Sequence, residues 1–367
     1  MRYSEGMIKF SINGFGRVGR STARVWLDKH LNSLDLAAIN TSGSLPASGW
    51  AYLLKYDTAY GTVPYSVEAE DLKDVQEVTD DDPLIGNLKI AKDGHQIVIP
   101  VLAQREPAKI PWSKYGVEAV VESTGLFRSR DLASQHLTGG AKLVIVSAPA
   151  KGGGMPTALI GVNEEQIIGH DRTNAITLIS NASCTTNCVA PVAALMHAKI
   201  GVRKAMLLTA HGYTDDQNLQ DNSHKDYRRG RAAAQNIVPT STGAAEATIA
   251  TIPELKGLFD GIALRVPVIT GSITDFTFLT KRGTSVEEVN QMFEDAITHP
   301  LYKGVLAVTR EPLVSSDIIG RSESAIVDLN LTRVVDGDLV KILAWYDNEW
   351  GYANRLVEQV IEAAQAL

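Results

Sequence analysis

Two cysteines could supply a nucleophile, and both stand in one short motif, SNASCTTNC at 180–188. Its small hydroxylated residues precede an apolar run at 189–200, a pattern typical of a helix N-terminus. The positive end of the helix dipole lowers the pKa of a thiol at that position, which favours the nucleophilic thiolate. We therefore predict that Cys184 is a nucleophile and that Cys188 is a small buried packing residue. Metal binding by the pair is disfavoured because no second cysteine pair completes a site.

A histidine, His211, follows at the end of an apolar strand predicted over 205–210. At such a position an imidazole can take a proton from a thiol and return it later. A lone histidine more often has only a packing role, so the residues alone leave both interpretations open.

Three glycines, Gly14, Gly16 and Gly19, stand between an apolar strand at 8–12 and a helix predicted over 21–31. In a phosphate-binding turn the first glycine permits the tight turn, the second lets the backbone approach a pyrophosphate, and the third allows close helix–strand packing. A second buried strand at 34–40 completes a βαβ unit. The sequence therefore predicts a dinucleotide-binding turn.

The second strand lacks the acidic residue that usually binds the ribose 2′-hydroxyl of NAD. It ends in Asn40 and continues with Thr41, Ser42 and Gly43. A carboxylate at this point would repel a 2′-phosphate, whereas hydroxyl groups would not. This favours NADP or dual cofactor use over strict use of NAD.

The composition is that of a globular protein. The 367 residues suggest two domains, and 44% hydrophobic residues suffice for a large core. A net charge of −7 disfavours a dedicated nucleic-acid binder, and no apolar run approaches the ~18 residues of a membrane span. With two cysteines and an apolar strand from Ile8 in place of a signal peptide, we expect a cytoplasmic protein.

The elements of the second half differ from those of the first. β-rich runs at 206–211, 261–268, 272–281, 323–332 and 340–347 predict a larger, at least partly antiparallel sheet. Helices are predicted over 286–296 and 354–367. In the first half, the acidic interval 68–82 has Lys73 as its one basic residue and is predicted to be a solvated surface loop or hairpin.

The whole chain resembles phosphorylating glyceraldehyde-3-phosphate dehydrogenases. The matching motifs run in family order, from NGFGRVGR at 13–20 through VVESTG at 120–125 and SNASCTTNC at 180–188 to WYDNEWGYANR at 345–355. The resemblance implies a doubly wound α/β Rossmann cofactor domain over 1–183, completed by the C-terminal segment 348–367. It also implies an α+β catalytic domain over 184–347 with a mixed, largely antiparallel sheet, and a homotetramer.

The resemblance also implies the reaction. Cys184 matches the family's nucleophile and His211 its general base. The thiolate would add to the aldehyde of glyceraldehyde 3-phosphate, hydride loss to NAD or NADP would leave a thioester, and inorganic phosphate would release 1,3-bisphosphoglycerate. Erythrose-4-phosphate dehydrogenase is the alternative, although STGAA at 241–245 and ESTG at 122–125 favour the glyceraldehyde enzymes. Whether the flux is glycolytic, gluconeogenic or carbon-fixing stays open.

Two phosphate sites are implied by the resemblance. The substrate phosphate matches Thr214, Asp216 and Arg265. The attacking phosphate matches Ser183, Thr242 and Gly243, with Arg229 nearby, and Thr185 is counted with these phosphate-binding residues.

A third set of residues is implied for the cofactor. The residues that match the family's pyrophosphate-binding positions are Asn13, Gly14, Phe15, Gly16, Arg17 and Val18. The remaining matches, which surround the adenosine and nicotinamide, are Arg105, Ser123, Thr124, Gly125, Ser147, Asn348 and Tyr352.

Two positions depart from the NAD-dependent members of the family. Thr41 replaces an Asp, and Asn222-Ser223 replaces a Leu-Pro pair in the loop that would reach a neighbouring subunit. Together with Ser42, these departures point to NADP use.

Overall fold

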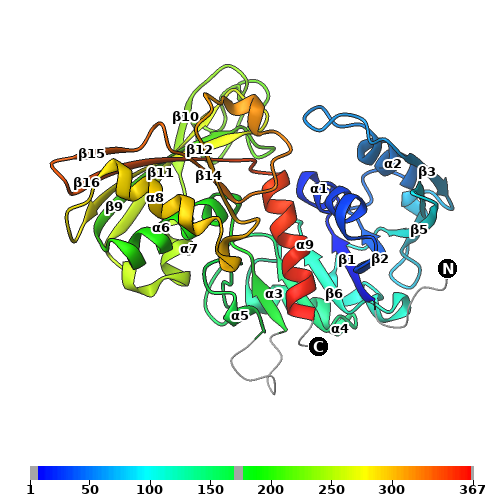
Figure 1. Ribbon diagram of the computed structural model, residues 1–367. Helices are drawn as coiled ribbons and strands as arrows, with labels where there is room; N and C mark the ends of the chain where they lie inside the picture. Colours follow the sequence, from blue (N-terminus) through cyan, green and yellow to red (C-terminus); the bar gives the residue numbers. More distant parts are fainter. Residues whose placement is uncertain (1–6, 169–176, 365–367) are drawn as a thin grey trace. The chain divides into compact units, whose positions relative to one another are not determined.

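The computed structural model describes residues 7–168 and 177–364, which form two compact units (Figure 1). The first unit comprises Met1–Thr157, Glu165–Asn181 and Ala353–Leu367. The second comprises Ala158–Glu164 and Ala182–Tyr352. No helix in the described ranges is both long and apolar enough to cross a membrane.

The first unit is built on an eight-stranded sheet with the order β3-β4-β5-β2-β1-β6-β7-β8. From β5 to β8 neighbouring strands are parallel, and the order reverses at β1, between β2 and β6. In doubly wound folds the ligand binds at such a switch point, beside the carboxyl ends of the strands. The strands are β1 (Ile8–Asn13), β2 (Leu34–Asn40), β3 (Ser66–Asp71), β4 (Leu84–Lys92), β5 (His95–Leu102), β6 (Ala119–Glu122), β7 (Leu143–Val146) and β8 (Leu178–Ser180).

The helices of this unit differ from the predicted ones mainly at their ends. α1 spans Arg17–Val25 and continues as a π-helical turn, Trp26–His30, so it begins directly after the glycine turn and not at Ser21. The prediction began too late because the polar first turn carries no apolar periodicity. The other helices are α2 (Ala47–Lys55), α3 (Arg130–Ala133), α4 (Gln135–Thr138), α5 (Glu165–Ile168) and most of α9 (Trp350–Ala364).

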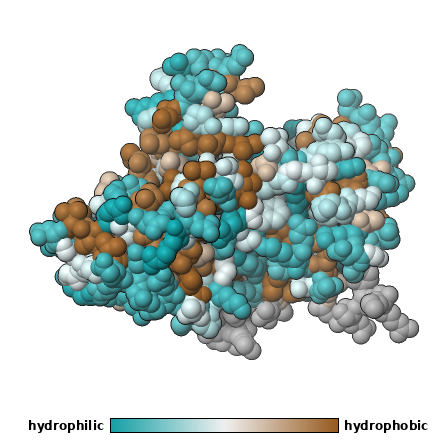
Figure 2. Space-filling model, turned by 45° about the horizontal axis from the view of Figure 1, so that its top comes forward, coloured by the Kyte–Doolittle hydropathy of each residue, from teal (hydrophilic) through white to brown (hydrophobic). Residues whose placement is uncertain are grey.

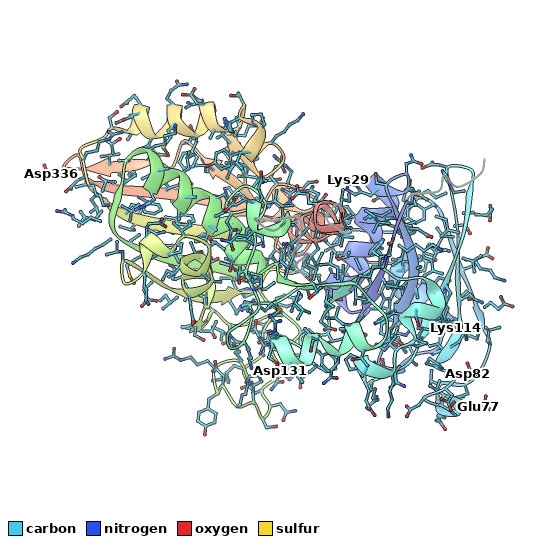
Figure 3. All side chains as sticks on the ribbon, turned by 90° about the horizontal axis from the view of Figure 1, so that it is seen from below. Lys29, Glu77, Asp82, Lys114, Asp131 and Asp336 are labelled. Carbon is cyan, nitrogen blue, oxygen red and sulfur yellow. The ribbon has the colours of Figure 1, made fainter. Side chains whose placement is uncertain are left out.

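The acidic interval is only partly a loop. Residues up to Asp71 belong to β3, which pairs with β4 in an antiparallel hairpin. The remainder is mostly exposed and contains a short 3-10 helix, Val75–Glu77, and Figure 3 shows Glu77 and Asp82 at the periphery of the unit. Strand pairing compensates the low β-propensity of the acids because their side chains face water.

The second unit carries the expected mixed sheet, with the order β10-β11-β9-β12-β16-β14-β13 and β15 paired to β16. Only the β9–β11 and β13–β14 pairs are parallel, so the predicted fold class is confirmed. The strands are β9 (Val202–Gly212), β10 (Val238–Ser241), β11 (Phe259–Val266), β12 (Ser272–Thr280), β13 (Leu306–Thr309), β14 (Ala325–Asp328), β15 (Arg333–Val335) and β16 (Leu339–Tyr346).

Three helices cover one face of this sheet: α6 (Cys184–Lys199), α7 (Ala244–Thr251) and α8 (Val286–Ala296). Alternate residues of β12, including Phe276 and Phe278, pack with apolar residues of these helices in one buried cluster. The prediction for 286–296 is confirmed, whereas α9 begins at Trp350, before the predicted Asn354.

The other face of the second sheet is only half-buried and combines apolar side chains with the Asp275–Lys341 ion pair. Leu208 on β9 pairs in register with the exposed Ile262 of β11 and with Asp275 of β12, and Asp275 pairs with Leu343 of β16. Hydrophobic residues gather over this unit in Figure 2. Exposed apolar residues such as Met206 and Ile262 on this face are typical of a protein–protein interface.

Candidate functional site

Cys184 is the first residue of α6. Ser183 caps the helix, because its hydroxyl oxygen accepts a hydrogen bond from Thr186 N at 3.1 Å. The preceding residue, Ala182, has a φ of 53°, a left-handed conformation that is strained for a residue with a Cβ. The left-handed residue and the cap together mark the start of α6, where Cys184 lies.

His211 faces this thiol. It is the penultimate residue of β9, and its Nε2 lies 3.4 Å from Cys184 Sγ. Arg265 on the parallel neighbour β11 is paired with His211 in register, which brings its guanidinium beside the imidazole. The geometry therefore unites a thiol, an imidazole and a cation in one unit of the fold.

The protonation of the pair differs from the prediction. Burial raises the pKa of the Cys184 thiol, although the positive charge of Arg265 opposes the shift. Burial, and secondarily Arg265, lowers the pKa of His211 to about 3. The expected lowering of the thiol pKa by the helix dipole is therefore wrong, because desolvation outweighs it. Near neutral pH the pair consists of a thiol and a neutral imidazole, which can act as a base.

The tautomer of His211 depends on its second nitrogen. Nδ1 lies 2.7 Å from Gly212 O and 2.7 Å from Arg265 Nη1. Nδ1 can donate to the carbonyl or accept from the guanidinium, but it cannot do both. If Nδ1–H donates to Gly212 O, then Nε2 keeps a lone pair for the thiol proton, and Arg265 Nη1 can donate to the same carbonyl at 3.3 Å.

A chain of hydroxyl groups lies next to the thiol. Thr185 Oγ1 is 3.1 Å from Tyr346 OH, which is 2.8 Å from Thr209 Oγ1. All three side chains are buried. The Thr185 hydroxyl, predicted among the phosphate-binding residues, is thus engaged inside the fold. Sequence analysis missed Thr209 and Tyr346, since hydroxyls within apolar strands give no distinctive pattern.

Three predicted phosphate residues form a second cluster. Arg229 Nη1 donates to Asp216 Oδ2 at 2.5 Å, and the Thr214 hydroxyl donates to the same carboxylate. Arg229 also donates to Thr240 Oγ1 at 2.8 and 2.9 Å, so its guanidinium contacts both Asp216 and β10, two residues before Thr242. Asp216 acts electrostatically on His211, while Arg265 helps to lower the pKa of Asp216, so this cluster is close to the thiol.

Two helix N-termini complete this unit. α6 begins after Ser183, and α7, which packs against α6, begins after Gly243. A Cβ added at Gly243 would meet nothing within 4 Å, so the first turn of α7 is open. Thr242 Oγ1 accepts from Ala244 N at 3.2 Å. Open first turns present backbone N–H groups that suit an anion.

The glycine turn lies in the first unit and has the shape of a phosphate cradle. A Cβ at Gly14 would lie 2.7 Å from Thr124 N, and one at Gly19 would lie 2.1 Å from Gly14 O. A Cβ at Gly16 would meet nothing within 4 Å. The outer two glycines thus allow close packing, and Gly16 keeps the first turn of α1 open to a pyrophosphate.

The residues that flank Gly16 in the chain differ in burial and in their contacts. Phe15 is buried, with its ring 6.0 Å from that of Trp50. Arg17 Nη1 donates to Asp57 Oδ2 at 2.5 Å, and Val18 lies in the first turn of α1. The side chain of Asn13 donates to Glu122 and accepts from Asn40, so the fold uses its hydrogen-bonding capacity.

The predicted ribose end lies beside β2 and β5. Thr41 is buried and donates its hydroxyl to Leu102 O at 3.0 Å, so it offers no free hydroxyl. Ser42 and Arg105 are both exposed, and they are in contact because Arg105 Nε donates to Ser42 O at 3.3 Å. An exposed arginine suits a 2′-phosphate. Ser147 follows β7, and its N–H donates to Glu122 O at 2.9 Å.

Ser123, Thr124 and Gly125 follow the carboxyl end of β6. The Ser123 hydroxyl donates to Gly14 O at 2.7 Å, and Thr124 N donates to Glu122 Oε1. Gly125 has a φ of 73°, and a Cβ added to it would meet no atom within 4 Å. These contacts hold the β6 end against the glycine turn.

The last predicted cofactor residues belong to the second unit. Asn348 Oδ1 accepts from Thr270, Gly271 and Ser272, which leaves its amide N–H groups without an acceptor among the described residues. Tyr352 donates its hydroxyl to Ala182 O at 3.0 Å. Ser223 lies in an exposed loop, where its N–H donates to Asn222 Oδ1 at 2.7 Å.

A sheet with a glycine turn at its switch point, together with a thiol–imidazole pair and clustered arginines, is an arrangement typical of a dinucleotide-dependent dehydrogenase. Comparison with known families agrees: the NAD binding domain of glyceraldehyde 3-phosphate dehydrogenase matches residues 8–130, and its C-terminal domain matches residues 183–348. The chain belongs to the glyceraldehyde-3-phosphate dehydrogenase family, which confirms the resemblance.

Similar proteins match over nearly the whole chain. Glyceraldehyde-3-phosphate dehydrogenase 2 of Streptomyces arenae is 46% identical over 351 residues, 96% of this chain and 97% of that protein. The enzyme of Zymomonas mobilis is 44% identical over 360 residues, 98% of this chain and 99% of that protein. Chloroplastic glyceraldehyde-3-phosphate dehydrogenase B of Pisum sativum is 44% identical over 352 residues, 96% of this chain and 73% of that protein.

Proposed function

We propose that this protein oxidises and phosphorylates glyceraldehyde 3-phosphate with NAD(P), through a thioester on Cys184. The observation that carries the proposal is the 3.4 Å contact between Cys184 Sγ and a neutral His211 Nε2, beside Arg265. Family membership supports the substrate.

The following sequence accounts for each proton transfer and each bond change in the proposed reaction. As Cys184 Sγ bonds to the aldehyde carbon, its proton passes to His211 Nε2. The resulting imidazolium stabilises the alkoxide of the hemithioacetal. The nicotinamide, when bound, supplies the two-electron acceptor for the hydride. Inorganic phosphate then attacks the thioester carbon, the C–S bond breaks, and the leaving sulfur regains its proton.

Arg265 is the proposed anchor of the substrate phosphate. Its Nε is buried and has no acceptor among the described residues, which fits a place for an anion. Thr214 and Asp216 stand nearby, with Arg229. The helix N-termini at Ser183 and Gly243, with Thr242, are the proposed site of the attacking phosphate.

The residues proposed to hold the cofactor come from the first unit, except for Asn348, which belongs to the second unit. Gly14, Gly16 and the first turn of α1 fit the pyrophosphate, and the free amide N–H groups of Asn348 fit the nicotinamide carboxamide. We propose NADP use alongside NAD. No carboxylate follows Asn40, and the exposed Arg105 and Ser42 offer a cation and a hydroxyl for a 2′-phosphate.

The organisation and assembly of the protein are also proposals. The first unit corresponds to the cofactor domain and the second to the catalytic domain. A homotetramer is supported by the half-buried apolar face around Ile262 and Leu343. A cytoplasmic location is supported by two free cysteines.

Steady-state assays test the function directly. The rate of NAD(P)H formation is measured with glyceraldehyde 3-phosphate, with and without inorganic phosphate, and with erythrose 4-phosphate as the competing substrate. We expect phosphate-dependent turnover of the triose. Higher kcat/KM with erythrose 4-phosphate contradicts the proposal. In parallel, Thr41→Asp lowers kcat/KM for NADP more than for NAD if the missing carboxylate permits NADP use.

A further inference from the structure

A buried carboxylate lies beneath the glycine turn. Glu122, the last residue of β6, is 1% exposed. Asn13 Nδ2 and His136 Nε2 donate to its Oε2, the latter at 3.0 Å. Thr124 N donates to Oε1 at 2.8 Å, and the Thr124 hydroxyl donates to the same oxygen. Four donors occupy the roughly four lone-pair positions of a carboxylate. Among the described residues, no lysine or arginine forms an ion pair with it.

His136 can serve this carboxylate only as a donor. The ring is fully buried, and its Nδ1 accepts from Trp112 Nε1–H at 3.1 Å. An indole nitrogen can only donate, so Nδ1 must keep its lone pair. The proton of the neutral ring is therefore on Nε2, pointing at Glu122. Trp112 fixes the tautomer that the carboxylate requires.

Glu122 connects the two strand ends that flank the switch point. Through Asn13 it holds the end of β1, and through Thr124 it holds the segment after β6. These segments touch, because a Cβ at Gly14 would lie 2.7 Å from Thr124 N and 2.9 Å from Ser123 C. A pyrophosphate is bound by backbone N–H groups of this turn only if the turn is already in place.

We propose that Glu122 is a positioning residue for the dinucleotide, with His136 as its fixed hydrogen-bond donor. Cofactor affinity depends on this pair, whereas the chemistry at Cys184 does not. The identity of the ligand rests on the proposed function.

The Glu122→Gln substitution tests the positioning role of Glu122, because a glutamine side chain has nearly the same shape as a glutamate side chain. A glutamine presents one oxygen and one NH₂ group. If the NH₂ group replaces Oε2, it faces the donors of Asn13 and His136, and if it replaces Oε1, it faces Thr124 N–H. His136 cannot relieve the conflict by moving its proton, because Trp112 donates to Nδ1.

The decisive measurement is the dissociation constant of the reduced cofactor, followed by nicotinamide fluorescence and without substrate. We expect Glu122→Gln to weaken binding about tenfold or more and to raise KM for the cofactor, with kcat at saturation within about twofold. The alkylation rate of Cys184 by iodoacetamide stays unchanged, which also shows that the second unit is folded. Glu118→Gln is the matched control, because Glu118 lies just before β6 and pairs with the exposed Lys142. It leaves the dissociation constant unchanged.

Two variants of His136 test the donor independently. His136→Gln can still present an N–H to Glu122 and binds the cofactor more tightly than His136→Leu. An unchanged dissociation constant in Glu122→Gln and His136→Leu, even with a lowered melting temperature, assigns the pair to stability alone and overturns the inference. Failure of the wild-type protein to bind any nicotinamide dinucleotide overturns the proposed function as well.

Discussion

At the scale of single residues, the two cysteines have opposite surroundings. Cys184 faces His211, while Cys188 is buried in the core of the second unit and its thiol points to Ala344 O. We predict that Cys184→Ala abolishes turnover and that Cys188→Ala keeps kcat within a few-fold. His211→Asn slows thioester formation by about 100- to 10,000-fold because it removes the base. Stopped-flow absorbance of NAD(P)H checks all three variants. Substantial turnover by Cys184→Ala contradicts the assignment.

The lowered pKa of His211 also predicts a pH dependence of stability. Its pKa is about 3 in the folded chain against 6.5 for an ordinary histidine. Between these values the unfolded state binds a proton that the folded state does not, so the free energy of unfolding falls as the pH falls. The contribution is at most about 1.4 kcal/mol per pH unit.

Urea unfolding between pH 6.5 and pH 4 measures this contribution. We expect His211→Gln to lose less stability over the interval than the wild-type protein. Equal slopes for the wild-type protein and His211→Gln contradict a buried neutral imidazole.

At the scale of elements, the glycine turn and α1 make two distinct predictions. Gly19→Ala places a Cβ 2.1 Å from Gly14 O, so the turn must shift, and we expect a loss of about 1–3 kcal/mol of stability. Gly16→Ala meets no atom within 4 Å at a φ of −70°, so its stability changes by no more than about 1 kcal/mol. Its added methyl group nevertheless obstructs the pyrophosphate and weakens cofactor binding. Thermal unfolding and nicotinamide fluorescence separate the two effects, and equal melting temperatures for both variants contradict this account of the turn.

Elements with clear periodicity could be predicted from the sequence. The strand at 34–40 and the helix at 286–296 have the predicted bounds because their patterns are unbroken. The start of α1 was missed because the turn, and not apolar spacing, determines it. Glu122 and His136 were not singled out, since their pairing depends on a contact between β6 and α4 that no local pattern indicates. The thiol pKa depends on burial, which a motif does not reveal.

At the scale of the whole molecule, the half-buried face of the second sheet predicts assembly. Ile262 is 53% exposed at this face. Because a buried charge without a partner is costly, we expect Ile262→Glu to break the proposed tetramer into smaller species while the fold of the subunit survives. Val98→Glu, at a 59% exposed position in β5, is the matched control and leaves the mass unchanged. Light scattering with in-line size exclusion measures both, and an Ile262→Glu protein of unchanged mass contradicts the proposed interface.

We propose that a thioester accumulates on Cys184 until inorganic phosphate attacks it, and a rapid-mixing experiment can detect this intermediate. Enzyme and cofactor are mixed with glyceraldehyde 3-phosphate in phosphate-free buffer, and peptide mass spectrometry follows acid quenching. We expect a burst of one reduced cofactor per subunit, an acyl group on Cys184, and continued turnover only after phosphate is added. Steady turnover without phosphate, or an acyl group on any other residue, would contradict it.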